Sequence, residues 1–172
     1  TTIAGDITTT GSGAHGIYNL GDDNSSTLAA GGSITTSGSD AAGIYNFGDS
    51  KETTVFGSIS TGGERAYGIY NKVSNNTTTI SNGGGISTEG VDAYGIYFSG
   101  NNSTATVGGD ITTTGSGAHG IYNLNNNSST LAADGSITTA GSDAYGIYNF
   151  GDNNTTTIAG DITTTGSGAH GI

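Results

Sequence analysis

The tetrapeptide Gly-Ile-Tyr-Asn returns along this chain at a nearly constant interval, and this periodicity constrains the fold more than any other feature. Self-similarity with a period of roughly 20–50 residues is typical of solenoids, propellers and other repeat architectures. A propeller blade needs about 40–50 residues and four strands, so the shorter period favours a solenoid. The copies begin at Gly16, Gly43, Gly68, Gly95, Gly120, Gly146 and Gly171, which lie 25 to 27 residues apart, and Phe98 replaces the Asn of the fourth copy.

Each repeat contains two further aliphatic positions. One follows a Thr, and the other is an Ile that precedes the Ile of Gly-Ile-Tyr by ten residues. Each lies in a run of strand-forming residues bounded by Gly, Asn, Asp and Ser, which favour turns. The spacing between the two positions alternates between four and six residues, so we predict a turn that is two residues longer in every second coil. The aliphatic residues that follow Thr are Ile3, Leu28, Val55, Ile80, Val107, Leu131 and Ile158.

These patterns predict an all-β fold without helices, because no segment shows the apolar spacing of an amphipathic helix. We expect a parallel β-helix, or β-solenoid, with three short strands per coil of about 25–27 residues and roughly six to seven coils. Residues 1–172 would form a single repeat segment. Neighbouring coils would stack with their strands about 4.8 Å apart, so that identical residues form ladders along the molecule.

Two Ile positions of each repeat are predicted to form core ladders. The first is the Ile that precedes the Ile of Gly-Ile-Tyr by ten residues, and the second is the Ile of Gly-Ile-Tyr itself. The Thr two residues after the first of these Ile should also point inward, with its hydroxyl bonded along the stack. The Asn of Gly-Ile-Tyr-Asn suggests an Asn ladder at a turn, and the Gly suggests a kink in the strand. The core ladders comprise Ile7, Ile34, Ile59, Ile86, Ile111, Ile137 and Ile162, together with Ile17, Ile44, Ile69, Ile96, Ile121 and Ile147.

The composition excludes several classes of function. Three Lys and Arg stand against 14 Asp and Glu, and the net charge of −11 removes the electrostatic basis for nucleic-acid binding. No apolar run approaches the roughly 18 residues of a membrane-spanning helix, so we expect no direct membrane insertion of this segment. The chain has no Cys, which excludes disulfides and thiolate metal sites.

The Tyr of the repeat admits two interpretations. If the preceding Ile points inward, alternation along the strand places the Tyr outside, in a stripe that would mark a contact surface. Alternatively, the Gly kinks the strand and the Tyr packs partly into a corner of the coil. The Tyr residues of this possible contact ladder are Tyr18, Tyr45, Tyr70, Tyr97, Tyr122 and Tyr148.

A second array precedes the first aliphatic position, where Thr-x-Thr or a close variant recurs. On a flat solenoid face this array resembles the ice-binding surface of some antifreeze proteins, in which regular hydroxyl and methyl groups order water. Glu52 interrupts the array, and Thr is also simply a favourable residue in exposed strands. The Thr residues of this possible contact ladder are Thr27, Thr54, Thr79, Thr106, Thr130 and Thr157.

The sequence predicts no catalytic, metal or cofactor-binding residues. His15, His119 and His170 share one repeat position but lie two or four coils apart, too far to share a zinc ion. We therefore expect them to face solvent. The acidic turns lack the spacing of calcium-binding loops, and no long insertion brings carboxylates together, so we expect no enzyme.

The segments at 7–19 and 111–123, Ile-Thr-Thr-Thr-Gly-Ser-Gly-Ala-His-Gly-Ile-Tyr-Asn, resemble repeats of bacterial autotransporter (type V secreted) adhesin passengers. The resemblance implies a right-handed parallel β-helix, exported to the cell surface and active in adhesion or self-association. It implies no catalytic residues.

The leading hypothesis from the sequence is a structural or adhesive extracellular β-solenoid, such as a stalk or fibre segment that contacts cell-surface or matrix ligands. The alternative is ice binding through the Thr ladder. Residues 1–17 are identical to residues 156–172, and neither end shows a capping segment. We therefore expect a segment of a longer array, or a unit that stacks end to end into a filament.

Overall fold

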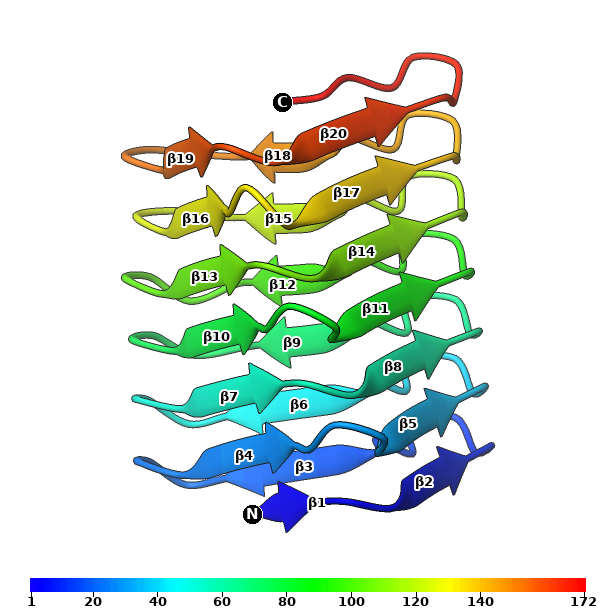
Figure 1. The fold of residues 1–172 in the computed structure, drawn as a ribbon, viewed down its shortest axis with the longest axis vertical. Coiled ribbons are helices and arrows are strands. Elements are labelled where there is room, and N and C mark those ends of the chain that lie inside the picture. Colours follow the sequence, from blue (N-terminus) through cyan, green and yellow to red (C-terminus); the bar gives the residue numbers. More distant parts are fainter.

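The computed structural model describes all residues from Thr1 to Ile172 and shows a three-sided β-solenoid (Figure 1). The chain forms 20 strands and no helix, and every strand pair is parallel. Each coil contributes one strand to each of three sheets, which confirms the predicted fold class. In Figure 1 the strands of two sheets run to the right in front and those of the third return behind them as the chain rises, so the coil is right-handed.

The three sheets are named here by the order in which the chain visits them. The first sheet contains β1 (Thr2–Ile3), β4 (Ser25–Leu28), β7 (Glu52–Val55), β10 (Thr77–Ile80), β13 (Thr104–Val107), β16 (Ser128–Leu131) and β19 (Thr155–Ile158). The second sheet contains β2 (Asp6–Thr9), β5 (Ser33–Thr36), β8 (Ser58–Thr61), β11 (Gly85–Thr88), β14 (Asp110–Thr113), β17 (Ser136–Thr139) and β20 (Asp161–Thr164). The third sheet contains β3 (Ile17–Leu20), β6 (Ile44–Phe47), β9 (Ile69–Asn71), β12 (Ile96–Phe98), β15 (Ile121–Asn123) and β18 (Ile147–Asn149).

The turn between the first and second sheets alternates in length, as predicted. Phe56 and Gly57 alone join β7 to β8, whereas residues 81–84 join β10 to β11. Both lengths lead into the same strand register, because Ile59 pairs with Ile86 across this difference. The longer turn therefore absorbs its two extra residues without shifting the ladders.

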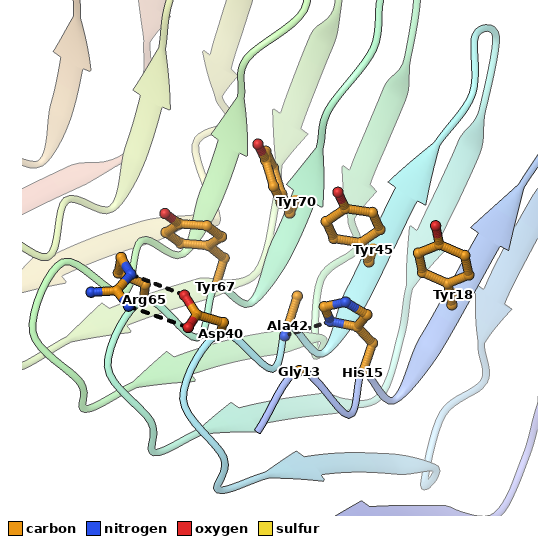
Figure 2. Close-up of a pocket in the computed structure, with 9 residues that line it drawn as sticks. All are labelled: Gly13, His15, Tyr18, Asp40, Ala42, Tyr45, Arg65, Tyr67 and Tyr70. Atoms are coloured by element: carbon orange, nitrogen blue, oxygen red, sulfur yellow. Dashed lines mark hydrogen bonds and ion pairs between the residues drawn. The ribbon is translucent and has the colours of Figure 1, made fainter. Parts of the chain in front are cut away.

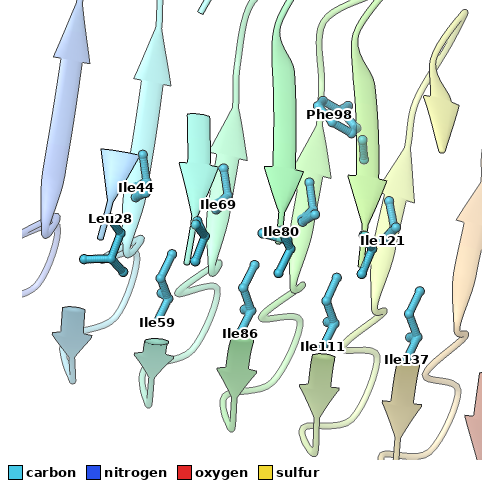
Figure 3. Close-up of a cluster of buried hydrophobic side chains, with 14 of the residues drawn as sticks. Leu28, Ile44, Ile59, Ile69, Ile80, Ile86, Phe98, Ile111, Ile121 and Ile137 are labelled. Atoms are coloured by element: carbon cyan, nitrogen blue, oxygen red, sulfur yellow. The ribbon is translucent and has the colours of Figure 1, made fainter. Parts of the chain in front are cut away.

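The Ile ladders form the core, as predicted, and Figure 3 shows the Ile of successive coils side by side in rows. Residues such as Ile34 and Ile69 are fully buried. Ile7 and Ile162, in the outermost coils, pack against the same cluster but are only partly buried. Parallel in-register pairing produces this arrangement, since each Ile lies beside its own equivalent in the next coil.

The inward Thr of the second sheet closes a turn within its own coil, which corrects the expectation that its hydroxyl bonds along the stack. The Oγ1 atom of Thr36 donates to the carbonyl oxygen of Ala41 at 2.6 Å, and Thr139 bonds Ala144 in the same way at 2.7 Å. The chain bends sharply just after this Thr, so the carbonyl five residues ahead is the acceptor within its reach.

The Asn ladder lies inside the core, and the expectation of an Asn ladder at a turn was wrong. Asn46 follows Ile44 by two residues and therefore points to the same, inward side of the strand. Its Nδ2 atom donates to Oδ1 of Asn71 at 2.7 Å and to Oγ1 of Thr53 at 3.0 Å. A buried amide side chain needs such partners, and the equivalent Asn of the next coil provides one in register.

The Gly of Gly-Ile-Tyr lies at a bend that leads into the third sheet, in line with the predicted kink, and close packing between coils is what requires a glycine there. Gly43 does not have a positive φ. A Cβ atom at this position would lie 2.3 Å from Cγ2 of Ile59 and 2.8 Å from the carbonyl oxygen of Gly68. Any larger residue would therefore push neighbouring coils apart.

Candidate functional site

The Tyr residues of the repeat form an outward column on the third sheet. Tyr18 is 52% exposed at the first coil, and the Tyr residues above it are half-buried. Parallel register places each ring beside the next, with centroids 4.9 Å apart for Tyr70 and Tyr97 and 5.1 Å apart for Tyr97 and Tyr122. The structure thus places these residues outside the coil, while contacts with neighbouring rings partly cover those above Tyr18.

A second column of rings lies beside the first, at the position three residues earlier in each repeat. Its rings pack against the Tyr of their own coil and of the next coil. Tyr94, for example, lies 5.4 Å from Tyr97 and 5.1 Å from Tyr122 between ring centroids. We call the two columns together the aromatic face. The rings of the second column are His15, Tyr67, Tyr94, His119, Tyr145 and His170.

Sequence reasoning missed this second column as part of a joint surface. The signal was the aromatic residue that occupies this position in six of the seven repeats. In an extended strand, residues three apart point to opposite sides. The chain turns between the two positions, and this turn brings both rings to the outside.

His15 and His119 pack against several neighbouring rings, so the expectation that all three His face solvent was wrong, and only His170 in the last coil is exposed. His119 is only 7% exposed, and its ring stacks on Tyr145 with a centroid separation of 5.0 Å. His15 is half-buried, and its Nδ1 atom accepts a hydrogen bond of 3.0 Å from the backbone N–H of Ala42. Burial lowers the pKa of His15, and it lowers the pKa of His119 to about 4. Both rings are therefore neutral at pH 7.

The hydroxyls of Tyr67, Tyr94 and Tyr97 remain protonated over the physiological range. Burial raises the pKa of Tyr97 to about 12, with smaller contributions from Tyr70 and Tyr122. It also raises the pKa of Tyr67 and that of Tyr94. The face thus presents neutral rings and hydroxyl groups, which suit an uncharged, partly apolar ligand.

Ala42 replaces an aromatic residue in the second column and leaves a cavity of about 420 Å³ in the aromatic face (Figure 2). At its rim Arg65 forms a two-point ion pair with Asp40, with Nε–Oδ1 and Nη2–Oδ2 distances of 2.9 and 3.2 Å. Arg65 also pairs with Glu64. The cavity is lined by Gly13, His15, Tyr18, Asp40, Ala42, Tyr45, Arg65, Tyr67 and Tyr70.

The predicted Thr ladder lies on the outer surface of the first sheet. In-register pairing places Thr79 between Thr54 and Thr106, and the inward residues between them are buried. A parallel column on the same surface contains Ser25, Glu52, Thr77, Thr104, Ser128 and Thr155. The first sheet therefore presents two columns of hydroxyl groups. Glu52 interrupts the second of them.

The structure brings together no group of three or more His, Asp or Glu side chains that could hold a metal ion. The structure contains no helix that could span a membrane. Comparisons with known protein families, with curated proteins and with solved structures find no match. The fold itself defines the class of this protein: a three-sided parallel β-solenoid with an aromatic face on one sheet and a hydroxyl-rich face on another.

Proposed function

We propose that this protein is an extracellular structural and adhesive β-solenoid that contacts cell-surface or matrix ligands through its aromatic face. The observation that supports this proposal most strongly is the continuity of that face, in which rings from successive coils lie about 5 Å apart along the solenoid. Aromatic surface of this extent is uncommon on soluble proteins outside interaction sites.

The aromatic face is well organised for binding. Rings within the columns are held between neighbours above and below, such as Tyr97 between Tyr70 and Tyr122, so little side-chain freedom remains to be lost when a ligand binds. The repetition along the solenoid also offers several equivalent contacts to an extended or repetitive ligand. Weak contacts that act together in this way produce high avidity.

The charge of the chain supports the choice of ligand class. A net charge of −11 disfavours nucleic acids and anionic membranes. The aromatic face itself is built from Tyr rings and holds the neutral rings of His15 and His119, so uncharged surface polymers such as glycans fit it better than polyanions. The resemblance of the repeats to those of autotransporter adhesins supports the extracellular location that we propose.

The decisive experiment compares two double variants in the same coils. Tyr97→Ala with Tyr122→Ala removes two rings from the aromatic face, whereas Thr106→Ala with Thr130→Ala alters the first sheet. We expect the Tyr variant to lose at least tenfold in binding to immobilised cells or extracellular matrix and the Thr variant to bind normally. Sedimentation analysis shows whether self-association contributes. Equal binding by both variants would contradict the proposal.

Ice binding through the first sheet is the second candidate. The observation that favours it is the register of Thr79 with Thr54 and Thr106, which places hydroxyl and methyl groups about 4.8 Å apart on a flat surface. Thermal hysteresis and ice-crystal shaping by the purified protein test this function. We expect Glu52→Thr to increase both effects because it completes the second hydroxyl column, and absence of hysteresis in both proteins would exclude ice binding.

A further inference from the structure

The cavity at Ala42 corresponds to one missing ring in an otherwise regular column. The seven equivalent repeat positions carry aromatic side chains except at Ala42. A ring at this position would lie between Tyr45 and Tyr70 on one side and between His15 and Tyr67 along the column, as Tyr94 does two coils further on. These four residues, together with Tyr18, are the aromatic walls of the cavity. Figure 2 shows them arranged around Ala42.

Along the column, the space is as wide as one flat ring. Where the column is complete, consecutive rings lie 5.1 Å apart for Tyr67 and Tyr94 and 5.0 Å apart for Tyr94 and His119. Two such steps separate His15 from Tyr67, so one flat ring can enter between them. The gap also alters the first column, because Tyr45 and Tyr70 meet edge-on at 81°, whereas Tyr70 and Tyr97 stack at 7°.

The polar groups at the rim select the chemistry of the occupant. Asp40 offers carboxylate acceptors and Arg65 offers guanidinium donors side by side, and both side chains are about half exposed. A sugar hydroxyl donates and accepts at the same time, so neighbouring hydroxyls can bond both groups while the C–H face of the sugar packs on the rings. A plain aromatic side chain would leave both rim groups without new partners.

Charge excludes two other flat ligands. A nucleotide or an acidic sugar would bring an anion beside Asp40 and Glu64, on a chain with a net charge of −11. Arg65 already binds both of these carboxylates, so the three rim residues together carry a net negative charge. A neutral ring with several hydroxyl groups is therefore the best match.

We propose that the Ala42 cavity is a binding subsite for one neutral pyranose ring. The inference rests on the proposed function, because it identifies one class of ligand for the aromatic face. The sugar ring takes the place of the missing side chain in the second column, between His15 and Tyr67, with its hydroxyl groups toward Asp40 and Arg65.

The test uses saturation-transfer NMR with the methyl glycosides of glucose, galactose and mannose as probes. We expect saturable transfer from Tyr protons to the ring C–H protons of at least one probe, with a millimolar dissociation constant. Ala42→Tyr inserts the ring that the column carries at 67, 94 and 145, and it should weaken binding at least tenfold. Asp40→Asn and Arg65→Gln, which leave the cavity open, should each weaken binding about three- to tenfold.

Tyr94→Ala provides a matched control because it opens a second cavity in the same column. The residues equivalent to Asp40 and Arg65 are there Asp92 and Gly117, so the second cavity lacks the guanidinium group. We expect it to bind the probes more weakly than the native cavity. Comparable binding there would show that the rim does not select the ligand and would contradict the inference.

Three further outcomes would overturn the subsite: no saturable transfer from any neutral probe, unchanged binding in Ala42→Tyr, or tighter binding of N-acetylneuraminic acid or adenosine monophosphate. The proposed function can fail or survive separately. If Ala42→Tyr retains adhesion while the Tyr97 and Tyr122 double variant loses it, adhesion stands without a special subsite. If the methyl glycosides bind but neither variant affects adhesion, the subsite stands and the adhesive role fails.

Discussion

The Nδ1 atom of His119 accepts a hydrogen bond of 3.0 Å from the backbone N–H of Tyr145, one coil further along the chain. The two rings also stack nearly parallel, at 6°. Only a neutral imidazole with an unprotonated Nδ1 can accept this bond. The contact therefore joins two coils of the aromatic face and depends on the charge of one side chain.

The stability of the solenoid should decrease in mildly acidic solution because of this contact. The unfolded chain binds a proton at His119 near pH 6.5, whereas the folded chain binds it only near pH 4. The unfolded state thus holds more protons between these values, and stability is lost as pH falls through this range. We expect a loss of about 1–2 kcal/mol between pH 7 and pH 5, after allowance for residual solvent contact. Urea denaturation at several pH values measures it.

His119→Tyr and His170→Tyr provide a matched pair for this experiment. Tyr already occupies the equivalent position at 94 and 145. Because His119 is buried and His170 is exposed, only the first substitution should make the dependence on pH shallower. The same slope in both variants would contradict the assignment.

Lys51→Asn should stabilise the protein. The side chain of Lys51 is buried, and its Nζ atom has no hydrogen-bond partner. The Asn at the equivalent position of the next coil, Asn76, donates from Nδ2 to the carbonyl oxygen of Val73 and accepts at Oδ1 from the backbone of Lys51. Removing a buried side-chain nitrogen that has no hydrogen-bond partner and supplying these bonds should raise the free energy of unfolding by about 1–3 kcal/mol.

The reverse substitution, Asn76→Lys, is the control for Lys51→Asn. It should lower stability by a similar amount, because it removes both side-chain bonds of Asn76. Thermal and urea denaturation measure the two variants in parallel. A Lys51→Asn protein that is less stable than the wild type would show that the ammonium finds favourable partners in solution.

The effects of substitutions at Phe98 and Ala105 on stability should be coupled. The two residues occupy the positions of Asn71 and Thr78, which are hydrogen-bonded to each other in the preceding coil, and both are buried. Phe98→Asn alone leaves a void and an amide without its hydroxyl partner, because Ala105 cannot accept the bond, and should cost about 3–5 kcal/mol. Ala105→Thr alone overfills the core and should cost about 1–3 kcal/mol.

The double variant, Phe98→Asn combined with Ala105→Thr, restores the polar pair found in the other coils and should cost much less than the sum of the single changes. A double-mutant cycle based on urea denaturation should therefore give a coupling energy of at least about 2 kcal/mol. Additive single effects would show that the two residues pack independently.

Gly62 and Gly63 are neighbours in sequence, but only Gly63 lies where a side chain would not fit. A Cβ atom at Gly63 would lie 2.1 Å from the backbone carbonyl oxygen of Gly38, whereas one at Gly62 would approach Thr36 no closer than 3.9 Å. Gly63→Ala should therefore destabilise the fold by about 2 kcal/mol or more. Gly62→Ala should leave stability unchanged or raise it by up to about 1 kcal/mol. Similar melting temperatures for the two variants would contradict the close stacking of these turns.

The repeat in the sequence was sufficient to predict the architecture. Residues that recur every 25 to 27 positions and favour strands can pair in register only with their own copies, so a parallel solenoid follows. Alternation along each strand then placed Ile59 inside and Thr54 outside, as the structure confirms. The alternating turn length was predictable for the same reason, since it is a difference in spacing along the chain.

Tertiary structure decided how the three sides of each coil face one another. Alternation from Ile44 to Asn46 turns the Asn ladder inward, but the hydroxyl partner of each amide, such as Thr53, comes from another sheet, and no local pattern in the sequence shows that contact. The aromatic face exists because a turn brings His119 beside Tyr122 and the next coil supplies Tyr145 and Tyr148. The sequence by itself determined the period, the strands and the inward Ile. The polar ladder, the stacked rings and the cavity at Ala42 depend on distances between separate turns and sheets, which only the folded chain defines.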